Sequence, residues 1–240
     1  MPGPTRRALL AAAGGTLAAG VTGCRSGPSD GRLTFRTTRS RRWTGRRGLV
    51  ELDGALLYVP RSSRTRAARV VVALHGAGGR PDSQIRLFRP HAERHGLLVL
   101  APQSTGRTWD VVTGAYGPDV RRVDRLLRRV GAAYRVGGCT LGGFSDGATY
   151  ALSLGLDNGD LFDSVVALSP GFSAGQHHRG RPRVFVSHGT RDQVLPIDRC
   201  SRRIVPALRD EDYDVTYVEF DGRHEVPPPV TARAARWLSS

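Results

Sequence analysis

The sequence predicts one α/β domain over residues 48–240, with a mostly parallel sheet and helices on both faces. Two observations support this fold class. From Leu49 onward, short runs of β-branched and apolar residues alternate with longer amphipathic stretches, an order typical of strands joined by helices. Several of these runs are apolar at almost every position, as expected of strands covered on both faces. The segment between strands at 169–183 has only about fifteen residues, so we expect no large cap domain.

The sheet is expected to start with an antiparallel pair. The runs LVELDG and ALLYVP meet at Asp53-Gly54, a dipeptide that favours the tight turn of a β-hairpin. The later apolar runs are bounded by loops or by helical stretches. They predict strands at residues 69–76, 97–102, 139–144, 163–169, 183–189 and 215–220.

The clearest helix is expected at residues 118–134. Apolar side chains there recur every three or four residues on one face, and arginines occupy the other faces. Further helices are expected at 82–95, 146–158, 198–210 and 228–238.

The composition is that of a globular protein with an excess of positive charge. The 240 residues carry a formal net charge of +15, and all 36 basic residues are arginine. Because lysine is absent, we interpret the excess as a general composition bias rather than as a binding patch. The arginines at 36–47 predict either a solvated linker or a contact with an anionic surface. No nucleic-acid motif accompanies the charge, so we expect no nucleic-acid partner.

Residues 1–23 have the pattern of a signal peptide. The paired Arg6 and Arg7 precede a weakly apolar run of signal-peptide length, too short to span a bilayer. The sequence VTGC resembles the bacterial lipoprotein cleavage box, which implies lipidation at Cys24; an ordinary cleaved signal is the alternative. We expect export to the cell envelope, as a membrane-anchored lipoprotein or otherwise as a secreted protein. Residues 24–47 are expected to form a flexible tether rich in Arg, Gly and Ser.

Two further cysteines remain in the domain. Cys139 is expected at the start of a central strand, and Cys200 after a loop at the opposite edge of the sheet. We therefore expect two buried thiols that do not form a disulfide.

Two segments fit the pattern G-x-S-x-G, which in many hydrolases exposes a nucleophilic serine between a strand and a helix. They are GFSDG at 143–147 and GFSAG at 171–175. A predicted strand precedes Ser145 and a predicted helix follows it directly. Ser173 follows a strand, but the polar, Gly- and Pro-containing residues after it do not predict a helix. Ser145 is therefore the candidate nucleophile, and Ser173 is interpreted as a loop serine.

An acidic residue and a histidine follow later strands. A serine nucleophile needs a base, and the base needs a carboxylate that orients it. Asp192 lies shortly after the strand expected at 183–189, and His224 lies just after the strand at 215–220. Their order along the chain, Ser, Asp and then His, is that of α/β-hydrolases. Asp198 is a rival for the acidic position, but its place fits a helix cap better.

Five segments together resemble the α/β-hydrolase serine esterases, in particular the phospholipase/carboxylesterase group with acyl-protein thioesterases and dienelactone hydrolases. The segments are HGAGG, APQSTGRTWD, GFSDGA, SHGTRDQVLP and DGRHEVPP, and they cover nearly the whole domain in order. The resemblance implies that Ser145 is the nucleophile, that His224 is the general base and then acid, and that Asp192 orients His224.

The same arrangement implies an oxyanion hole formed by backbone N–H groups. Asp146 follows the nucleophile and is expected to provide one donor, and Ala77 in the glycine-rich loop is expected to provide the other. Trp109 is expected either to line the substrate pocket or to pack beneath its loop. His75 and His188 are expected to hydrogen-bond to backbone rather than to act as bases.

These residues predict an enzyme that cleaves carboxylic esters through an acyl-enzyme intermediate, without a metal or cofactor. The expected partner is a small-molecule or lipid-like ester, with membrane contact through the lipid anchor. The same residues also suit a peptidase, a thioesterase or an acyltransferase. A binding protein of the envelope that keeps the fold without turnover is a further alternative.

Overall fold

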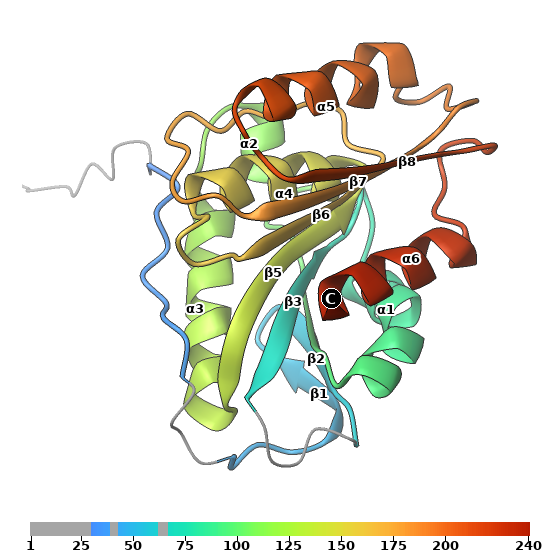
Figure 1. Ribbon diagram of the computed structural model, residues 1–240. Helices are drawn as coiled ribbons and strands as arrows, with labels where there is room; N and C mark the ends of the chain where they lie inside the picture. The colour runs from blue at the N-terminus through green and yellow to red at the C-terminus, as the bar shows by residue number, and fades with distance from the viewer. Residues whose placement is uncertain (1–29, 39–42, 62–66) are drawn as a thin grey trace, which may run out of the picture.

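The computed structural model describes residues 30–38, 43–61 and 67–240, which form a layered α/β domain around an eight-stranded sheet (Figure 1). The strand order is β1-β2-β4-β3-β5-β6-β7-β8. β2 pairs antiparallel with β1 and β4, and all other neighbours are parallel. The strands are β1 (Gly48–Leu52), β2 (Ala55–Val59), β3 (Ala68–Leu74), β4 (Leu98–Pro102), β5 (Val136–Phe144), β6 (Ser164–Leu168), β7 (Arg183–Gly189) and β8 (Val215–Phe220).

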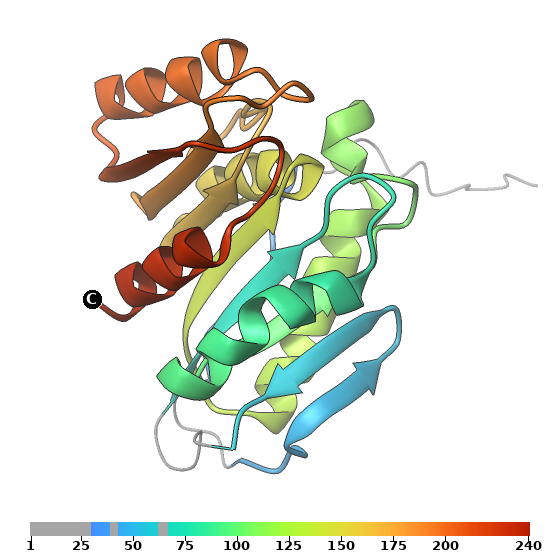
Figure 2. The same cartoon turned by 90° about the vertical axis from the view of Figure 1, so that its right-hand side faces the viewer.

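Helices cover both faces of the sheet, as Figures 1 and 2 show. α1 and α6 lie together on one face, and α3, α4 and α5 lie on the other. The helices are α1 (Pro81–His95), α2 (Asp110–Thr113), α3 (Pro118–Ala133), α4 (Asp146–Asp157), α5 (Ser201–Asp210) and α6 (Pro228–Ser239). The sequence therefore predicted the fold class, the hairpin and five of these six helices.

Each face of the sheet has its own hydrophobic core because successive strand residues point to opposite sides. Val70 and Val72 of β3 belong to the core that includes residues of α3 and α4. Val71, between them, belongs to the core shared with α1 and α6. A strand buried on both faces must be apolar throughout, which is why these runs were recognisable in the sequence.

Two elements differ from the prediction. β5 begins at Val136, three residues earlier than expected, because Gly137 and Gly138 are part of it. A methyl group at Gly137 would lie 2.8 Å from the Ala67 side chain, so the missing side chain permits this close packing although glycine is a poor strand former. α2 has only four residues and is too short to show a helical period.

The expectation of a flexible tether at 24–47 is wrong for the parts of this segment that the structure describes. Leu33 and Phe35 are buried in the core beside α3 and α4. The Asp124 carboxylate accepts the N–H groups of Thr34 and Phe35, both at 2.8 Å. Thr44 and Gly45 likewise donate to the carbonyl of Ala133. The folded domain therefore begins before residue 48. The sequence did not predict this, because Leu33 and Phe35 stand among many Arg, Gly and Ser residues.

The leader expected at 1–23 and the lipidation expected at Cys24 lie outside the described residues. Within the described ranges, no helix is both long and apolar enough to cross a membrane. Cys139 and Cys200 are buried free thiols, as expected.

We predict that Phe35→Ala lowers the free energy of unfolding by about 3 kcal/mol, because the change leaves a cavity in the core. Leu49→Ala is the control, since Leu49 is 57% exposed and its truncation leaves no cavity. Urea unfolding of both variants measures the difference. If Phe35→Ala unfolds like the Leu49 control, then residues 30–38 do not pack on the domain.

Candidate active site

The candidate active site lies at the edge of the sheet where β5, β7 and β8 end. These strands are parallel, so the loops that follow them leave the sheet on the same side. Ser145 follows β5, Asp192 follows β7 and His224 follows β8. The fold thus brings together a histidine and its partners that are 79 and 32 residues away in the sequence.

Ser145 sits on a tight turn between β5 and α4. Its φ of 58° and ψ of −123° are strained for a residue with a side chain. Backbone hydrogen bonds hold the turn: Ser145 N–H donates to Leu168 O at 3.0 Å, and Ser145 O accepts from Ala148 N–H at 2.9 Å. The serine is therefore fixed at the amino end of α4, where the helix dipole favours negative charge.

The two glycines of the motif permit close packing around this turn. A methyl group at Gly147 would lie 2.2 Å from the carbonyl oxygen of Leu74 in β3. One at Gly143 would lie 2.4 Å from the backbone of Gly147. Both distances are shorter than any real contact of a methyl carbon, so β3, β5 and α4 can meet only if both residues are glycine.

Ser145, His224 and Asp192 form a continuous hydrogen-bonded chain. His224 Nε2 lies 2.8 Å from Ser145 Oγ, and His224 Nδ1 lies 2.6 Å from Asp192 Oδ2. The Asp192 side chain is fully buried, whereas that of His224 is 14% exposed. The ring of Phe144 packs against the imidazole, with ring centroids 4.7 Å apart. In this arrangement Nδ1 donates to the carboxylate, and Nε2 is left to accept a proton from the serine.

The Asp192 carboxylate has hydrogen-bond partners on both oxygens. Oδ1 accepts the N–H groups of Val194 at 2.9 Å and Leu195 at 2.8 Å. Oδ2 faces His224 and, at 3.2 Å, Nε2 of His188. Burial of a carboxylate costs free energy unless such donors replace the water that it loses. Asp198, the rival for this role, is exposed and pairs with Arg202, so the structure does not support a role for it here.

His188 is a buried residue whose part in this site the sequence did not reveal. Its Nε2 lies 2.8 Å from Leu195 O, the expected backbone contact, as well as near Asp192. Both partners are pure acceptors, so Nε2 carries the proton, and Nδ1 accepts from the Ser201 hydroxyl at 2.6 Å. Burial lowers the pKa of His188 and keeps the ring neutral. Only contacts in the folded structure distinguish this histidine from any other at the end of a strand.

The His75 side chain holds the glycine-rich loop after β3, residues 75–79, in place. Ser104 N–H donates to His75 Nε2 at 3.2 Å, so the proton is on Nδ1, which donates to Gly76 O at 2.8 Å. Burial lowers the pKa of His75, which fits this neutral form. A methyl group at Gly76 would lie 3.2 Å from the Ser145 side chain, so the loop runs close beside the serine.

Two backbone N–H groups near Ser145 have no acceptor among the described residues. In the glycine-rich loop, Gly78 N–H donates to Arg107 O and Gly79 N–H donates to Gly76 O, whereas no bond is found for Ala77. Asp146 is the first residue of α4, where N–H groups have no intrahelical partner. The Asp146 carboxylate accepts from Thr108 Oγ1 at 2.6 Å. The two expected oxyanion donors are thus not used by other groups.

Trp109 does not line the site. Its side chain is fully buried, its Nε1 donates to His75 O at 2.8 Å, and its ring stacks on Tyr150. The expectation of a substrate-binding role is therefore wrong, and the alternative of packing beneath the loop is confirmed. Because the indole N–H has a buried acceptor, the ring can be part of the hydrophobic core.

Ser173 lies in a segment, residues 171–177, that runs along α4. We call this segment the strap. Three side chains of α4, spaced four residues apart, accept its backbone N–H groups: Thr149 from Gly171, Ser153 from Ala174, and Asp157 from His177, at 2.7–2.9 Å. No helix follows Ser173, so it is not on a second tight turn of the Ser145 kind.

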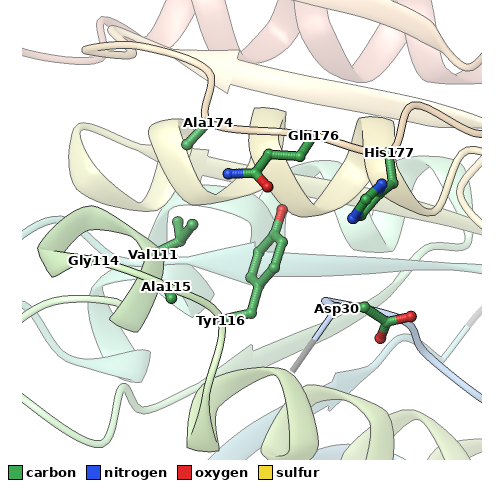
Figure 3. Close-up of a pocket in the computed structure, with 8 residues that line it drawn as sticks. All are labelled: Asp30, Val111, Gly114, Ala115, Tyr116, Ala174, Gln176 and His177. Atoms are coloured by element: carbon green, nitrogen blue, oxygen red, sulfur yellow. The ribbon is translucent and has the colours of Figure 1, made fainter. Parts of the chain in front are cut away.

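A cavity of about 290 Å³ lies between the strap, α2 and the start of the described chain. Figure 3 shows the Tyr116 ring standing in it, with the hydroxyl group directed toward Gln176 of the strap. The Tyr116 hydroxyl donates to Asp157, the same carboxylate that holds the strap. The cavity is lined by both polar and apolar side chains.

Comparisons with solved structures establish the fold. No protein-family model matches the sequence, and no curated protein matches it. Solved structures do match. An esterase named PE8 has a TM-score of 0.60 at 22% identity, over 80% of this chain and 98% of the other. A phospholipase/carboxylesterase from Dyadobacter fermentans has a TM-score of 0.60 at 21% identity, over 81% and 97%.

The chain has the α/β-hydrolase fold. A third similar structure is an S-formylglutathione hydrolase from Staphylococcus aureus, with a TM-score of 0.64 at 14% identity over 78% of this chain and 92% of that one. At these identities the likeness establishes the architecture. The chemistry must be argued from the residues of this chain.

We predict that Gly147→Ala lowers the free energy of unfolding by about 3 kcal/mol or more, because its methyl group overlaps the backbone of β3. Gly106→Ala is the control, since a methyl group there would meet no atom closer than 3.6 Å. Thermal or urea unfolding compares the two. Equal stability of both variants would show that β3 and α4 do not approach as closely as described.

We also predict that stability falls as the pH drops below about 6.5, the pKa of histidine in an unfolded chain. Burial lowers the pKa of His188 and His75 in the folded state, so between the folded and unfolded pKa values the unfolded chain binds more protons. Urea unfolding at about pH 7.5 and about pH 5.5 measures the loss. His188→Gln should reduce it, and the exposed control His177→Gln should not. An unchanged loss in His188→Gln contradicts a neutral, buried His188.

Proposed function

We propose that this protein is a serine hydrolase that cleaves carboxylic esters through an acyl-enzyme intermediate. The observation that carries the proposal is the hydrogen-bonded chain from Ser145 through His224 to Asp192, on a strained turn at the amino end of α4. A serine hydroxyl has little nucleophilicity by itself, and a histidine that can accept its proton provides it. The buried carboxylate orients the histidine and stabilises its protonated form.

In the proposed reaction, Ser145 Oγ attacks the ester carbonyl carbon while His224 Nε2 takes the hydroxyl proton. The carbonyl oxygen becomes an oxyanion, which the N–H groups of Ala77 and Asp146 would stabilise. The C–O bond to the alcohol then breaks, and His224 returns the proton to the departing alkoxide. A water molecule repeats the sequence at the acyl-enzyme, so the carboxylic acid leaves and the serine hydroxyl is restored.

The surroundings of Asp192 support this assignment. Two backbone N–H groups and the neutral His188 hold the carboxylate in one orientation. His224 therefore lies between a fixed acceptor and the serine. The Phe144 ring covers one face of His224 and limits the positions that the imidazole can adopt.

The similar structures favour an ester as the substrate class. Two of them are described as an esterase and a phospholipase/carboxylesterase. The third is described as an S-formylglutathione hydrolase, which favours a thioester as the second candidate. Acyl transfer from oxygen or sulfur would use the same three residues.

We expect Ser145→Ala to lower the hydrolysis rate of p-nitrophenyl esters about 10⁴-fold or more, because the nucleophile is lost. The series should run from acetate to palmitate, assayed with a form of the protein that starts after Cys24. Ser173→Ala is the matched control and should keep the rate of the unmutated protein.

Loss of activity in Ser173→Ala alone would contradict the assignment of Ser145. The absence of hydrolysis of every ester by the unmutated, folded protein would contradict the esterase proposal. An active-site label that reacts with nucleophilic serines, such as a fluorophosphonate, should modify the unmutated protein and spare Ser145→Ala.

A further inference from the structure

A groove of about 360 Å³ lies between the strap and α5. We call it the α5 groove. Apolar side chains line much of it, among them Phe172 of the strap with Ile204 and Leu208 of α5. Arg199 and Arg203 also line the groove. The groove therefore combines an apolar surface with two positive charges.

The α5 groove reaches the candidate active site at Gly171. The N–H of Gly171 donates to Thr149, one turn of α4 below Ser145. A methyl group at Gly171 would also lie 3.5 Å from Leu195, whose N–H holds Asp192. On the side of α5, Arg199 follows the loop that holds Asp192, and its N–H donates to Pro196 O at 2.9 Å. One end of the groove thus lies beside the catalytic side chains.

The arginines between residues 199 and 209 differ in whether their side chains have partners. Arg202 pairs with both Asp198 and Glu219, and Arg209 donates to the carbonyl of Val215. Arg199 and Arg203, which line the groove, form no ion pair and no side-chain hydrogen bond within the described residues. Two arginine side chains that line one groove without an acidic partner can both bind an anion.

The acidic residue that lines the groove does not neutralise them. Glu211 pairs with His178 Nδ1 at 2.8 Å, away from the end where Gly171 lies. With two arginines and one carboxylate among its charged side chains, the groove keeps a net positive charge.

Exposed apolar side chains occur on the strap and on the loop after β7. Phe172 lines the groove, and Val194 precedes Leu195, whose side chain would lie 3.5 Å from a methyl group at Gly171. Phe172 is 43% exposed and Val194 is 66% exposed. Apolar surface that remains in water beside a reactive serine is suited to contact a chain of methylene groups.

We infer that the α5 groove binds the acyl part of the ester, and that the preferred acyl group is an apolar chain that carries a carboxylate. The chain would lie against Phe172, and the carboxylate would bind Arg199 and Arg203. This inference rests on the proposed ester hydrolysis by Ser145. It adds a substrate class that the three catalytic side chains do not specify.

The test compares two esters of equal chain length that differ in charge. One is the mono-p-nitrophenyl ester of suberic acid, which ends in a carboxylate, and the other is its methyl-capped, neutral counterpart. We expect the unmutated protein to have a higher kcat/KM for the anionic ester. The double variant Arg199→Gln/Arg203→Gln should lower the anionic-to-neutral ratio about tenfold or more, while the value for the neutral ester changes little.

A second pair of arginines provides the matched control. Arg125 and Arg129 are exposed, are also four residues apart, and lie on α3. Arg125→Gln/Arg129→Gln removes the same charge and should leave the ratio unchanged. Phe172→Ser should lower kcat/KM for both suberate esters relative to p-nitrophenyl acetate, and it should keep the anionic-to-neutral ratio.

The outcomes separate this inference from the proposed function. Hydrolysis of both suberate esters with a ratio that the groove variant does not alter would overturn the inference and leave the esterase proposal intact. Equal effects of the two double variants would show a general effect of net charge and would also overturn it. If no ester is hydrolysed, the proposed function fails. In that case, binding of monomethyl suberate measured by calorimetry, and lost in Arg199→Gln/Arg203→Gln, would still support an anion-binding groove. If the unmutated protein did not bind monomethyl suberate, the inference would be overturned as well.

Discussion

The close approach of β3, β5 and α4 at Ser145 is the constraint on which the rest of the site depends. Because Gly143 and Gly147 have no side chains, these elements can approach so closely. The approach brings the loop after β3 to the side of Ser145 and directs the amino end of α4 toward the same place. Strain at one residue is tolerated because backbone hydrogen bonds from the adjacent strand and helix hold it.

The hydrogen bonds to the Asp192 carboxylate connect the turn at Ser145 to the loops after β7 and β8. Burial of a carboxylate without hydrogen-bond donors costs free energy, so the groups around Asp192 must supply them. Here the loop after β7 folds back so that its own N–H groups bind one oxygen, and His188 and His224 face the other. The order β5-β6-β7-β8 places this loop and the loop after β8 close enough to share the carboxylate.

The sequence was sufficient where local pattern and burial agree. Strands covered on both faces are apolar throughout, and the amphipathic α3 has a clear helical period, so both were predictable. The order of Ser145, Asp192 and His224 along the chain also predicted which side chains would meet.

His188 was recognisable only as a histidine at a strand end, because its contact with Asp192 depends on the path of the loop. Leu33 and Phe35 are two apolar residues in a polar segment, too few to indicate that it packs on the domain. Trp109 was ambiguous because an aromatic residue suits both a pocket and a core.

The attachment of the strap to α4 separates anchoring from recognition. Main-chain donors of the strap bind side chains of the helix, so the strap keeps its course whichever side chains it carries. Positions 172, 173 and 176 can therefore be exchanged during evolution without loosening the segment, provided that Thr149, Ser153 and Asp157 remain. Two hollows border this one segment, the cavity of Figure 3 and the groove beside α5. Substrate preference in such a scaffold can diverge by substitutions in a short, firmly held stretch, while the catalytic geometry stays unaltered.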